Sequence, residues 1–342
     1  MLNNGYCHDL IRDKMVQKLA YNETNDYQTW KKQIKEKFYE LLGLEDIENN
    51  RAKDPKFTIE SVEEKEEYTQ TRFTFESEEG CTTPCYLLVP KKIKKEKYPV
   101  AIVMQGHSPG FHNSIGVIKT PADEHFQPRG QLAIQAVRNG FIGLAIEQRG
   151  MGERVEGTEE RGYNCHYSAM TAIHMGRTVA GERIFDISCA IDIITEHFPV
   201  CDVDKILITG NSGGGTASYY AGCYDERIKI CAPSCAFSSY KDSILDIGHC
   251  PCNHIPGAFK WFDMGDLAGL IAKRKLLIIA GVNDDIFPIA GVRRQFEIVN
   301  KIYKKENAEE KAELIITPKE HWWCVDIVWP ALVKAAKELN WF

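Results

Sequence analysis

Hydrophobic residues follow two alternating patterns along the chain, and together these patterns predict an α/β fold. Six apolar runs of strand length lie at 100–104, 141–146, 205–209, 228–232, 276–280 and 314–317. They are almost continuously hydrophobic, as strands covered on both faces require. Between them, over 184–198 and 289–303, apolar residues recur every three or four positions, which is typical of amphipathic helices. This alternation predicts a mostly parallel central sheet with helices on both faces.

Two segments before residue 90 predict an antiparallel pair at one edge of that sheet. Residues 69–75 alternate and are rich in Thr and Phe, and residues 85–89 form a second strand-like run that ends at Pro90. The lysine-rich segment 91–97 follows directly, and we expect it to be a solvated connection rather than a binding patch.

Residues 1–55 are polar and biased towards helix. One helical stripe comprises Trp30, Ile34, Phe38, Leu41 and Leu42. Gly43 then offers a stop signal. We predict that residues 1–55 form a helical extension packed on a main domain of residues 56–342, with a lid or partner helix as the alternative.

Composition narrows the class of protein. Of the 342 residues, 44% are hydrophobic and 26% are charged, which is typical of a globular chain with a sizeable core. The formal net charge of −6 provides no cationic footprint for nucleic acid. The apolar runs are too short to span a membrane, and the first residues do not resemble a signal peptide. We therefore expect a cytoplasmic protein in which most of the 12 cysteines are small buried hydrophobes.

The most informative motif is Gly-Asn-Ser-Gly-Gly at 210–214. It follows a buried strand and precedes a helix of small residues, which is the setting of a G-x-S-x-G nucleophile elbow. Glycines flank such a serine because side chains there would clash with the neighbouring strand and helix. A phosphate-binding loop is the alternative, but no Lys-Ser or Lys-Thr pair follows and the glycine spacing does not fit a dinucleotide site. We predict that Ser212 is a nucleophile.

A serine hydroxyl needs a base within hydrogen-bond reach. Three histidines follow Ser212: His249, His254 and His321. Only His321 comes shortly after the last predicted strand, 314–317, where the base of such a fold is expected. We therefore predict that His321 is the base.

The acid that orients the base should follow the preceding strand. There the turn 281–288 offers Asp284 and Asp285. The spacing from the acid to Pro288 favours Asp284, and Asp285 is the alternative. An aspartate in this turn could instead cap the next helix.

Two backbone N–H groups should bind the oxyanion of the tetrahedral intermediate. One is expected from Gly213, directly after the nucleophile, and the other from His107 in the loop after strand 100–104. The side chain of His107 would then be free to touch substrate.

With these motifs, the chain resembles the α/β-hydrolase superfamily, and within it the branch of acetyl xylan esterases and dienelactone hydrolases. The likeness runs from the helix at 30–44 nearly to the C-terminus. It rests on Gln105-Gly106-His107, 149–154, 202–206, 210–214, 281–288 and His321. The resemblance implies an α/β-hydrolase fold and a serine esterase that acts through an acyl-enzyme on acetylated sugars or related small esters. It also implies that the protein can form homo-oligomers. Gln105 departs from the His-Gly often seen before the oxyanion loop.

Two segments suggest further binding. The first, residues 249–254, invites a zinc hypothesis completed by Cys231 and Cys235, but the Cys-Pro-Cys spacing argues against tetrahedral geometry, so we predict no metal and no cofactor. As an ordered loop it would line the substrate pocket with Trp261 and Phe262.

The second segment, residues 150–178, carries several basic side chains together with the preceding Arg149. They are Arg149, Arg154, Arg161, His166, His174 and Arg177. They could bind an anionic substrate group, and a salt-bridged surface loop is the alternative. Glu147 and Asp186 are expected to be structural.

The sequence thus predicts a serine carboxylesterase whose substrate is a small-molecule or oligosaccharide ester, including O-acetyl groups on carbohydrates. It predicts no nucleic-acid or membrane partner. A serine peptidase of the same fold and a catalytically silent binding protein remain as alternatives.

Overall fold

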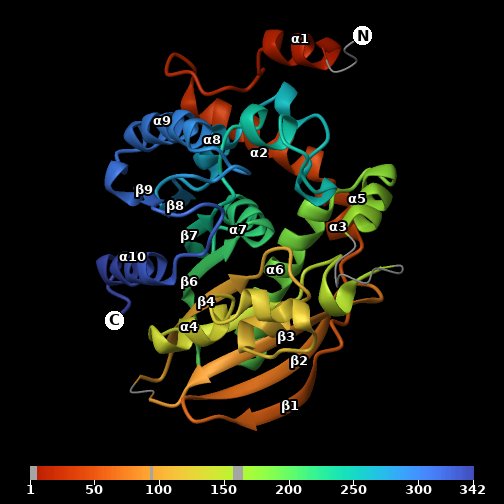
Figure 1. Ribbon diagram of the computed structural model, residues 1–342, viewed down its shortest axis with the longest axis vertical. Helices are drawn as coiled ribbons and strands as arrows, with labels where there is room; N and C mark the ends of the chain where they lie inside the picture. The colour runs from red at the N-terminus through yellow and green to blue at the C-terminus, as the bar shows by residue number, and fades with distance from the viewer. Residues whose placement is uncertain (1–5, 93–94, 157–164) are drawn as a thin grey trace.

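The computed structural model describes residues 6–92, 95–156 and 165–342. Over these residues one sheet runs in the order β1-β2-β3-β5-β4-β6-β7-β8-β9 (Figure 1). The strands are β1 (Thr58–Glu64), β2 (Tyr68–Glu78), β3 (Cys81–Pro90), β4 (Tyr98–Met104), β5 (Ile142–Ile146), β6 (Cys201–Asn211), β7 (Ile228–Ser234), β8 (Lys275–Gly281) and β9 (Ala312–Thr317).

The six strands predicted from the apolar runs all form, and they pair in parallel from β5 through β4 to β9. The predicted antiparallel pair also forms, as β2 and β3, and β3 joins β5 antiparallel. However, β1 lies outside β2 and is the true edge strand, which the sequence pattern did not predict. Its residues are exposed on both faces except for the half-buried Ser61, so it has no hydrophobic alternation to detect.

The helices are α1 (Tyr6–Lys14), α2 (Tyr27–Leu42), α3 (Leu44–Asn49), α4 (Leu132–Arg138), α5 (Cys165–His174), α6 (Val179–His197), α7 (Gly213–Tyr224), α8 (Met264–Leu267), α9 (Ile289–Lys305) and α10 (Val325–Glu338). Among the described helices, none combines the length and the apolar composition that a bilayer crossing requires.

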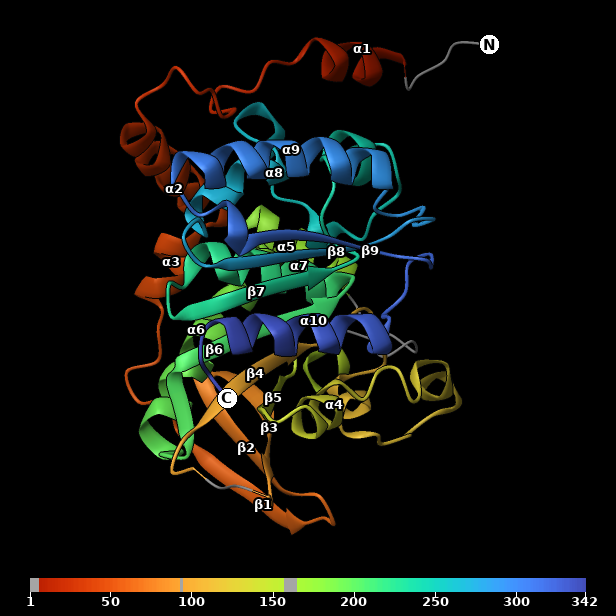
Figure 2. The ribbon, with the colours of Figure 1, turned by 90° about the vertical axis from the view of Figure 1, so that its left-hand side faces the viewer.

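Two hydrophobic cores cover the two faces of the sheet, because successive side chains of a strand point in opposite directions. In β4, Val100 and Ile102 join the core formed with α2, α6, α7 and α9, whereas Ala101 and Val103 join the core formed with α4 and α10. Figure 2 shows α4 and α10 on one side of the sheet and α6 and α7 on the other. The predicted three-layer arrangement is confirmed.

The N-terminal segment contributes to the first of these cores through α2. Its buried stripe follows the prediction at Trp30, Ile34, Phe38 and Leu42, and the helix ends at Gly43 with φ +71°. The Trp30 ring fits against Gly269, where an added Cβ would lie 2.7 Å from the ring. This helix is therefore integral to the core, while the division of the chain at residue 55 stays a prediction.

Candidate active site

Ser212 occupies the sharp turn between β6 and α7. Its backbone has φ +57° and ψ −126°, a conformation that side-chain-bearing residues rarely adopt. The N–H of Ser212 donates to the carbonyl of Ser234 over 2.9 Å. An added Cβ on Gly210 or Gly214 would lie 2.4 Å or 2.1 Å from the carbonyl oxygen of Met104, so only glycine fits there. The turn has the geometry of a nucleophile elbow.

His321 and Asp284 lie side by side after β9 and β8. The Nδ1 atom of His321 is 3.0 Å from Oδ2 and 3.2 Å from Oδ1 of Asp284. The backbone N–H groups of Ile286 and Phe287 also donate to Asp284. Burial raises the pKa of Asp284, but the hydrogen bonds and the charge of His321 outweigh it and leave the pKa below its ordinary value. Asp285 is exposed, so the carboxylate that contacts the imidazole is Asp284.

The other ring nitrogen of His321 faces inward. Among the described residues, its buried Nε2 has no hydrogen-bond partner. Ser212 and His321 line the same cavity, whose volume is about 390 Å³. The cavity is further lined by Gln105, Gly106, His107, Ser108, His125, Phe126, Arg129, Trp322 and Trp323. The sequence-predicted base and nucleophile are thus brought to one cavity.

The loop after β4 runs directly against the elbow. An added Cβ on Gly106 would lie 2.8 Å from the carbonyl oxygen of Asn211 and 3.2 Å from Cβ of Ser212. Gly213 is the first residue of α7, so its N–H lies at the helix N-terminus, where negative charge is favoured. Gly106, which precedes His107, and Gly213 both lie next to Ser212. The assignment of the oxyanion hole to the N–H groups of His107 and Gly213 stays a prediction.

Buried polar groups hold this loop in place. The Nε2 of Gln105 donates to Glu147 over 2.6 Å, and the amide of Gln148 donates to the carbonyl of Gln105. Glu147 also accepts from the N–H of Phe111. Burial raises the pKa of Glu147 to about 8. Gln105, which departs from the family pattern, is therefore an anchor of the loop.

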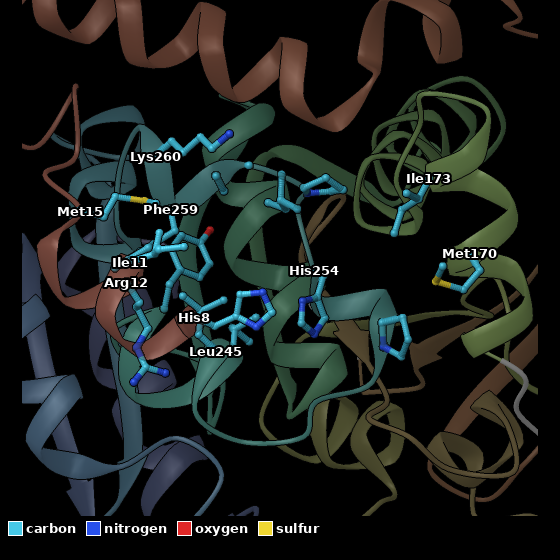
Figure 3. A pocket seen from close by; sticks show the side chains of 17 residues that line it. His8, Ile11, Arg12, Met15, Met170, Ile173, Leu245, His254, Phe259 and Lys260 are labelled. Atoms are coloured by element: carbon cyan, nitrogen blue, oxygen red, sulfur yellow. The ribbon is translucent and has the colours of Figure 1, made fainter. Parts of the chain in front are cut away.

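The segment 249–254 does not line the Ser212 cavity. The expectation that it lines the substrate pocket with Trp261 and Phe262 is therefore wrong. His249 bonds the Ser243 hydroxyl, and Pro251 and His254 line a different, mostly apolar cavity of about 700 Å³ against α1 and α5 (Figure 3). Phe262 is fully buried in the core. Trp261 packs beneath two lysine ammonium groups and is not among the residues that line the Ser212 cavity.

Most of the arginines after β5 are engaged in buried ion pairs. Arg149 pairs with Glu78 at 2.6 Å and with Asp186 at 2.8 Å, and Arg154 pairs with Asp186 at 2.6 Å. Arg177 pairs with Glu78 at 2.6 Å. This network supports the salt-bridged alternative and the structural role predicted for Asp186. Arg161 lies outside the described residues, and His166 and His174 are exposed on α5.

Sequence reasoning missed the cation that does line the cavity. The guanidinium of Arg129 lies 3.9 Å from the ring centroid of Trp322, next to His321. Its Nε is buried and has no hydrogen-bond partner among the described residues, and burial lowers its pKa. Nothing in the local sequence around Arg129 signals this, because only the fold brings the segment to the cavity.

Within the part of the chain that the structure describes, two clusters of side chains have the atoms to hold a metal. Cys235, Asp284 and His321 place their ligand atoms within 4.8 Å of one another, but the Asp284–His321 hydrogen bond already accounts for that grouping. The second cluster comprises His107, Cys165, Cys250 and Cys252. Cys231 is in neither group and Cys235 is not grouped with Cys250 and Cys252, so the described residues do not form the site that the zinc hypothesis would have completed with Cys231 and Cys235.

Comparison with known proteins agrees with this architecture. A model of the Abhydrolase family matches residues 3–230, which include Ser212 and end before Asp284 and His321. Over 293 residues the chain is 24% identical to YtaP of Bacillus subtilis (strain 168), which is named as a hydrolase; the match covers 84% of this chain and 92% of YtaP.

Three solved structures are similar over nearly the whole chain. One, from Bacteroides fragilis NCTC 9343, is named as an acetyl xylan esterase (TM-score 0.80, 15% identity, 98% of this chain and 95% of that one). The second is methylesterase BT1017 (TM-score 0.74, 19% identity, covering 97% of this chain and 68% of that one). The third is a glucuronoyl esterase from Solibacter usitatus (TM-score 0.64, 14% identity, covering 95% of this chain and 98% of that one). The fold is thus that of the α/β-hydrolase superfamily. Within it, the chain belongs to the Abhydrolase family.

Proposed function

We propose that this protein is a serine carboxylesterase in which Ser212, His321 and Asp284 form the catalytic triad. Ser212 attacks the ester carbonyl while the Nε2 of His321 takes its proton, and His321 returns that proton to the leaving alcohol. Asp284 holds the imidazole and stabilises its charged form. The N–H groups of His107 and Gly213 bind the oxyanion. Water activated by His321 then hydrolyses the acyl-enzyme.

The observation that carries the proposal is the convergence of three segments on one cavity. A strained serine, a histidine whose Nε2 has no partner among the described residues and a buried carboxylate on its Nδ1 come from the ends of β6, β9 and β8. Each feature alone has a structural explanation. Together they supply the nucleophile, base and orienting acid of acyl transfer, in the chain order of this fold.

The cavity supports a carbohydrate ester as the substrate. Trp322, with 38% of its surface exposed, provides apolar surface beside His321 that a sugar ring can contact, next to the guanidinium of Arg129. Arg129 adds donors that suit sugar hydroxyls or a carboxylate on the substrate. The structural neighbours named as an acetyl xylan esterase and a glucuronoyl esterase support this proposal. We propose O-acetyl groups on carbohydrates as the substrate class.

The direct test compares neighbouring carboxylates and the nucleophile on a short-acyl chromogenic ester. We expect Ser212→Ala to lower kcat by at least about 1,000-fold, and Asp284→Asn by roughly 1,000- to 10,000-fold. Asp285→Asn is the matched control and should keep turnover within about twofold. Retained turnover in Ser212→Ala would contradict the triad. Loss of turnover in Asp285→Asn but not in Asp284→Asn would show that the acid is Asp285 and that its assignment to Asp284 is wrong.

The same enzyme preparation separates an esterase from a peptidase. We expect acetylated sugars and short aryl esters to be hydrolysed, and the amides of the same acyl groups to be hydrolysed far more slowly. Preference for the amide would make the protein a peptidase. No turnover, together with no labelling of Ser212 by a fluorophosphonate, would favour a binding protein.

A further inference from the structure

Four potential metal ligands from three distant segments meet beside the elbow. His107 lies in the loop after β4, Cys165 begins α5, and Cys250 and Cys252 flank Pro251 in a short 3-10 turn. Their ligand atoms, three sulfurs and one imidazole nitrogen, all lie within 4.8 Å of one another. Cys165 and Cys252 are buried, and the other two are partly buried.

We propose that His107, Cys165, Cys250 and Cys252 form a structural zinc site. Three thiolates and one imidazole are a donor set typical of tetrahedral structural zinc. With Zn–S near 2.3 Å and Zn–N near 2.05 Å, a tetrahedral site places sulfur and nitrogen about 3.5 Å apart. The Sγ of Cys252 lies 3.3 Å from the Nε2 of His107. The ligands thus stand close to the required spacing.

The charge of the surroundings fits a metal–thiolate centre. Zinc with three thiolates carries one net negative charge, and a buried Arg183 lies beside it, with its guanidinium 3.3 Å from Sγ of Cys165 and in contact with Cys252. Among the described residues, no carboxylate pairs with Arg183; its other partner is the carbonyl of Arg149. A buried guanidinium beside three neutral thiols would lack a counter-charge, whereas the zinc centre supplies one.

The Cys-Pro-Cys spacing, which argued against zinc from sequence, is compatible with it here. The turn at 251–253 brings the Sγ atoms of Cys250 and Cys252 within 4.8 Å of each other. The third sulfur and the nitrogen come from elsewhere in the chain, so two closely spaced cysteines need to supply only one edge of the tetrahedron.

Zinc with four protein ligands has no open position for water, so it would be structural rather than catalytic. Its consequence for the active site runs through His107. An added Cβ on Gly213 would lie 3.0 Å from the ring atoms of His107, so the imidazole packs on the first turn of α7. The metal would therefore fix the loop whose backbone N–H is assigned to the oxyanion hole. This last step rests on the proposed function, whereas the metal site itself does not.

The test measures metal content and thiols in the purified full-length protein. We expect one zinc per chain by mass spectrometry of metals, and loss of at least 90% of it in Cys250→Ser/Cys252→Ser. Cys324→Ser, which changes a half-buried cysteine outside the cluster, should keep full zinc content. Replacement of zinc by Co²⁺ should give the thiolate charge-transfer and strong visible absorption bands of a tetrahedral sulfur-rich site. This readout does not depend on enzyme activity.

Each other outcome has a defined meaning. Less than about 0.1 zinc per chain with all 12 thiols titratable after denaturation would overturn the proposal, as would two missing thiols that return on reduction, which indicate a disulfide. If zinc is present and Ser212→Ala retains full esterase activity, the metal site stands and the proposed triad fails. If the triad variants behave as expected and no zinc is found, only the metal site fails.

Discussion

The backbone of Ser212 stores strain that a substitution can release. At φ +57° and ψ −126° a residue with a Cβ is destabilised by about 1–3 kcal/mol, and glycine is not. A glycine also lowers the stability of the folded state by about 0.5–1 kcal/mol, because it gives the unfolded chain greater conformational freedom. We therefore expect Ser212→Gly to be more stable than Ser212→Ala by about 1 kcal/mol. Both variants lack the hydroxyl, so the difference isolates the backbone.

Urea-induced unfolding of both variants measures this difference in the free energy of unfolding. Thermal unfolding is less suitable, because a change of 1 kcal/mol moves the Tm of a 342-residue chain by only about 1–2 °C. The matched control is Ser188, which lies inside α6 with ordinary helical geometry. There the order should reverse, with Ser188→Gly about 1 kcal/mol less stable than Ser188→Ala. If glycine is as unfavourable at 212 as at 188, the elbow stores no strain and the reasoning is wrong.

Three further predictions address the cavity and its acid. Gly213→Ala places a Cβ 3.0 Å from the ring of His107, so kcat should fall about 10- to 100-fold with little change in KM; steady-state kinetics on the folded variant would contradict this by showing full activity. Arg129→Ala should lower kcat/KM roughly tenfold for an ester that carries a carboxylate and within about twofold for its uncharged analogue; equal losses would make Arg129 only a support for the cavity wall. Because the pKa of Asp284 is lowered on folding, its ionised form stabilises the protein above its unfolded pKa, near 3.8. The stability advantage of wild type over Asp284→Asn, followed by unfolding from pH 7 to pH 2, should therefore shrink below about pH 4, and a gap that grows with acid would refute the sign.

The strands and the residues proposed for the triad could be predicted because their signals are local in sequence. Continuous apolar runs mark strands that are covered on both faces, and the elbow motif combines strand, turn and helix within a few residues. Asp284 and His321 followed from the same logic, because each comes directly after a predicted strand. The contact with His321 then decided between Asp284 and its exposed neighbour.

What could not be predicted depends on contacts between distant segments. The edge strand β1 is exposed on both faces along nearly all its length and so lacks a hydrophobic pattern. Arg129 reaches the cavity only through the fold, whereas Arg149 faces buried carboxylates that no spacing rule reveals. The cysteine cluster is the same case, since Cys165 stands far in sequence from Cys250.

The most direct test of the central claim is covalent labelling of the nucleophile. After exposure to a fluorophosphonate, intact-mass and peptide mass spectrometry should find one adduct per chain, on Ser212, with esterase activity lost in proportion to labelling. Only an activated serine reacts in this way. An unmodified Ser212 in protein that still hydrolyses esters, or an adduct on another serine that tracks the loss of activity, would contradict the account.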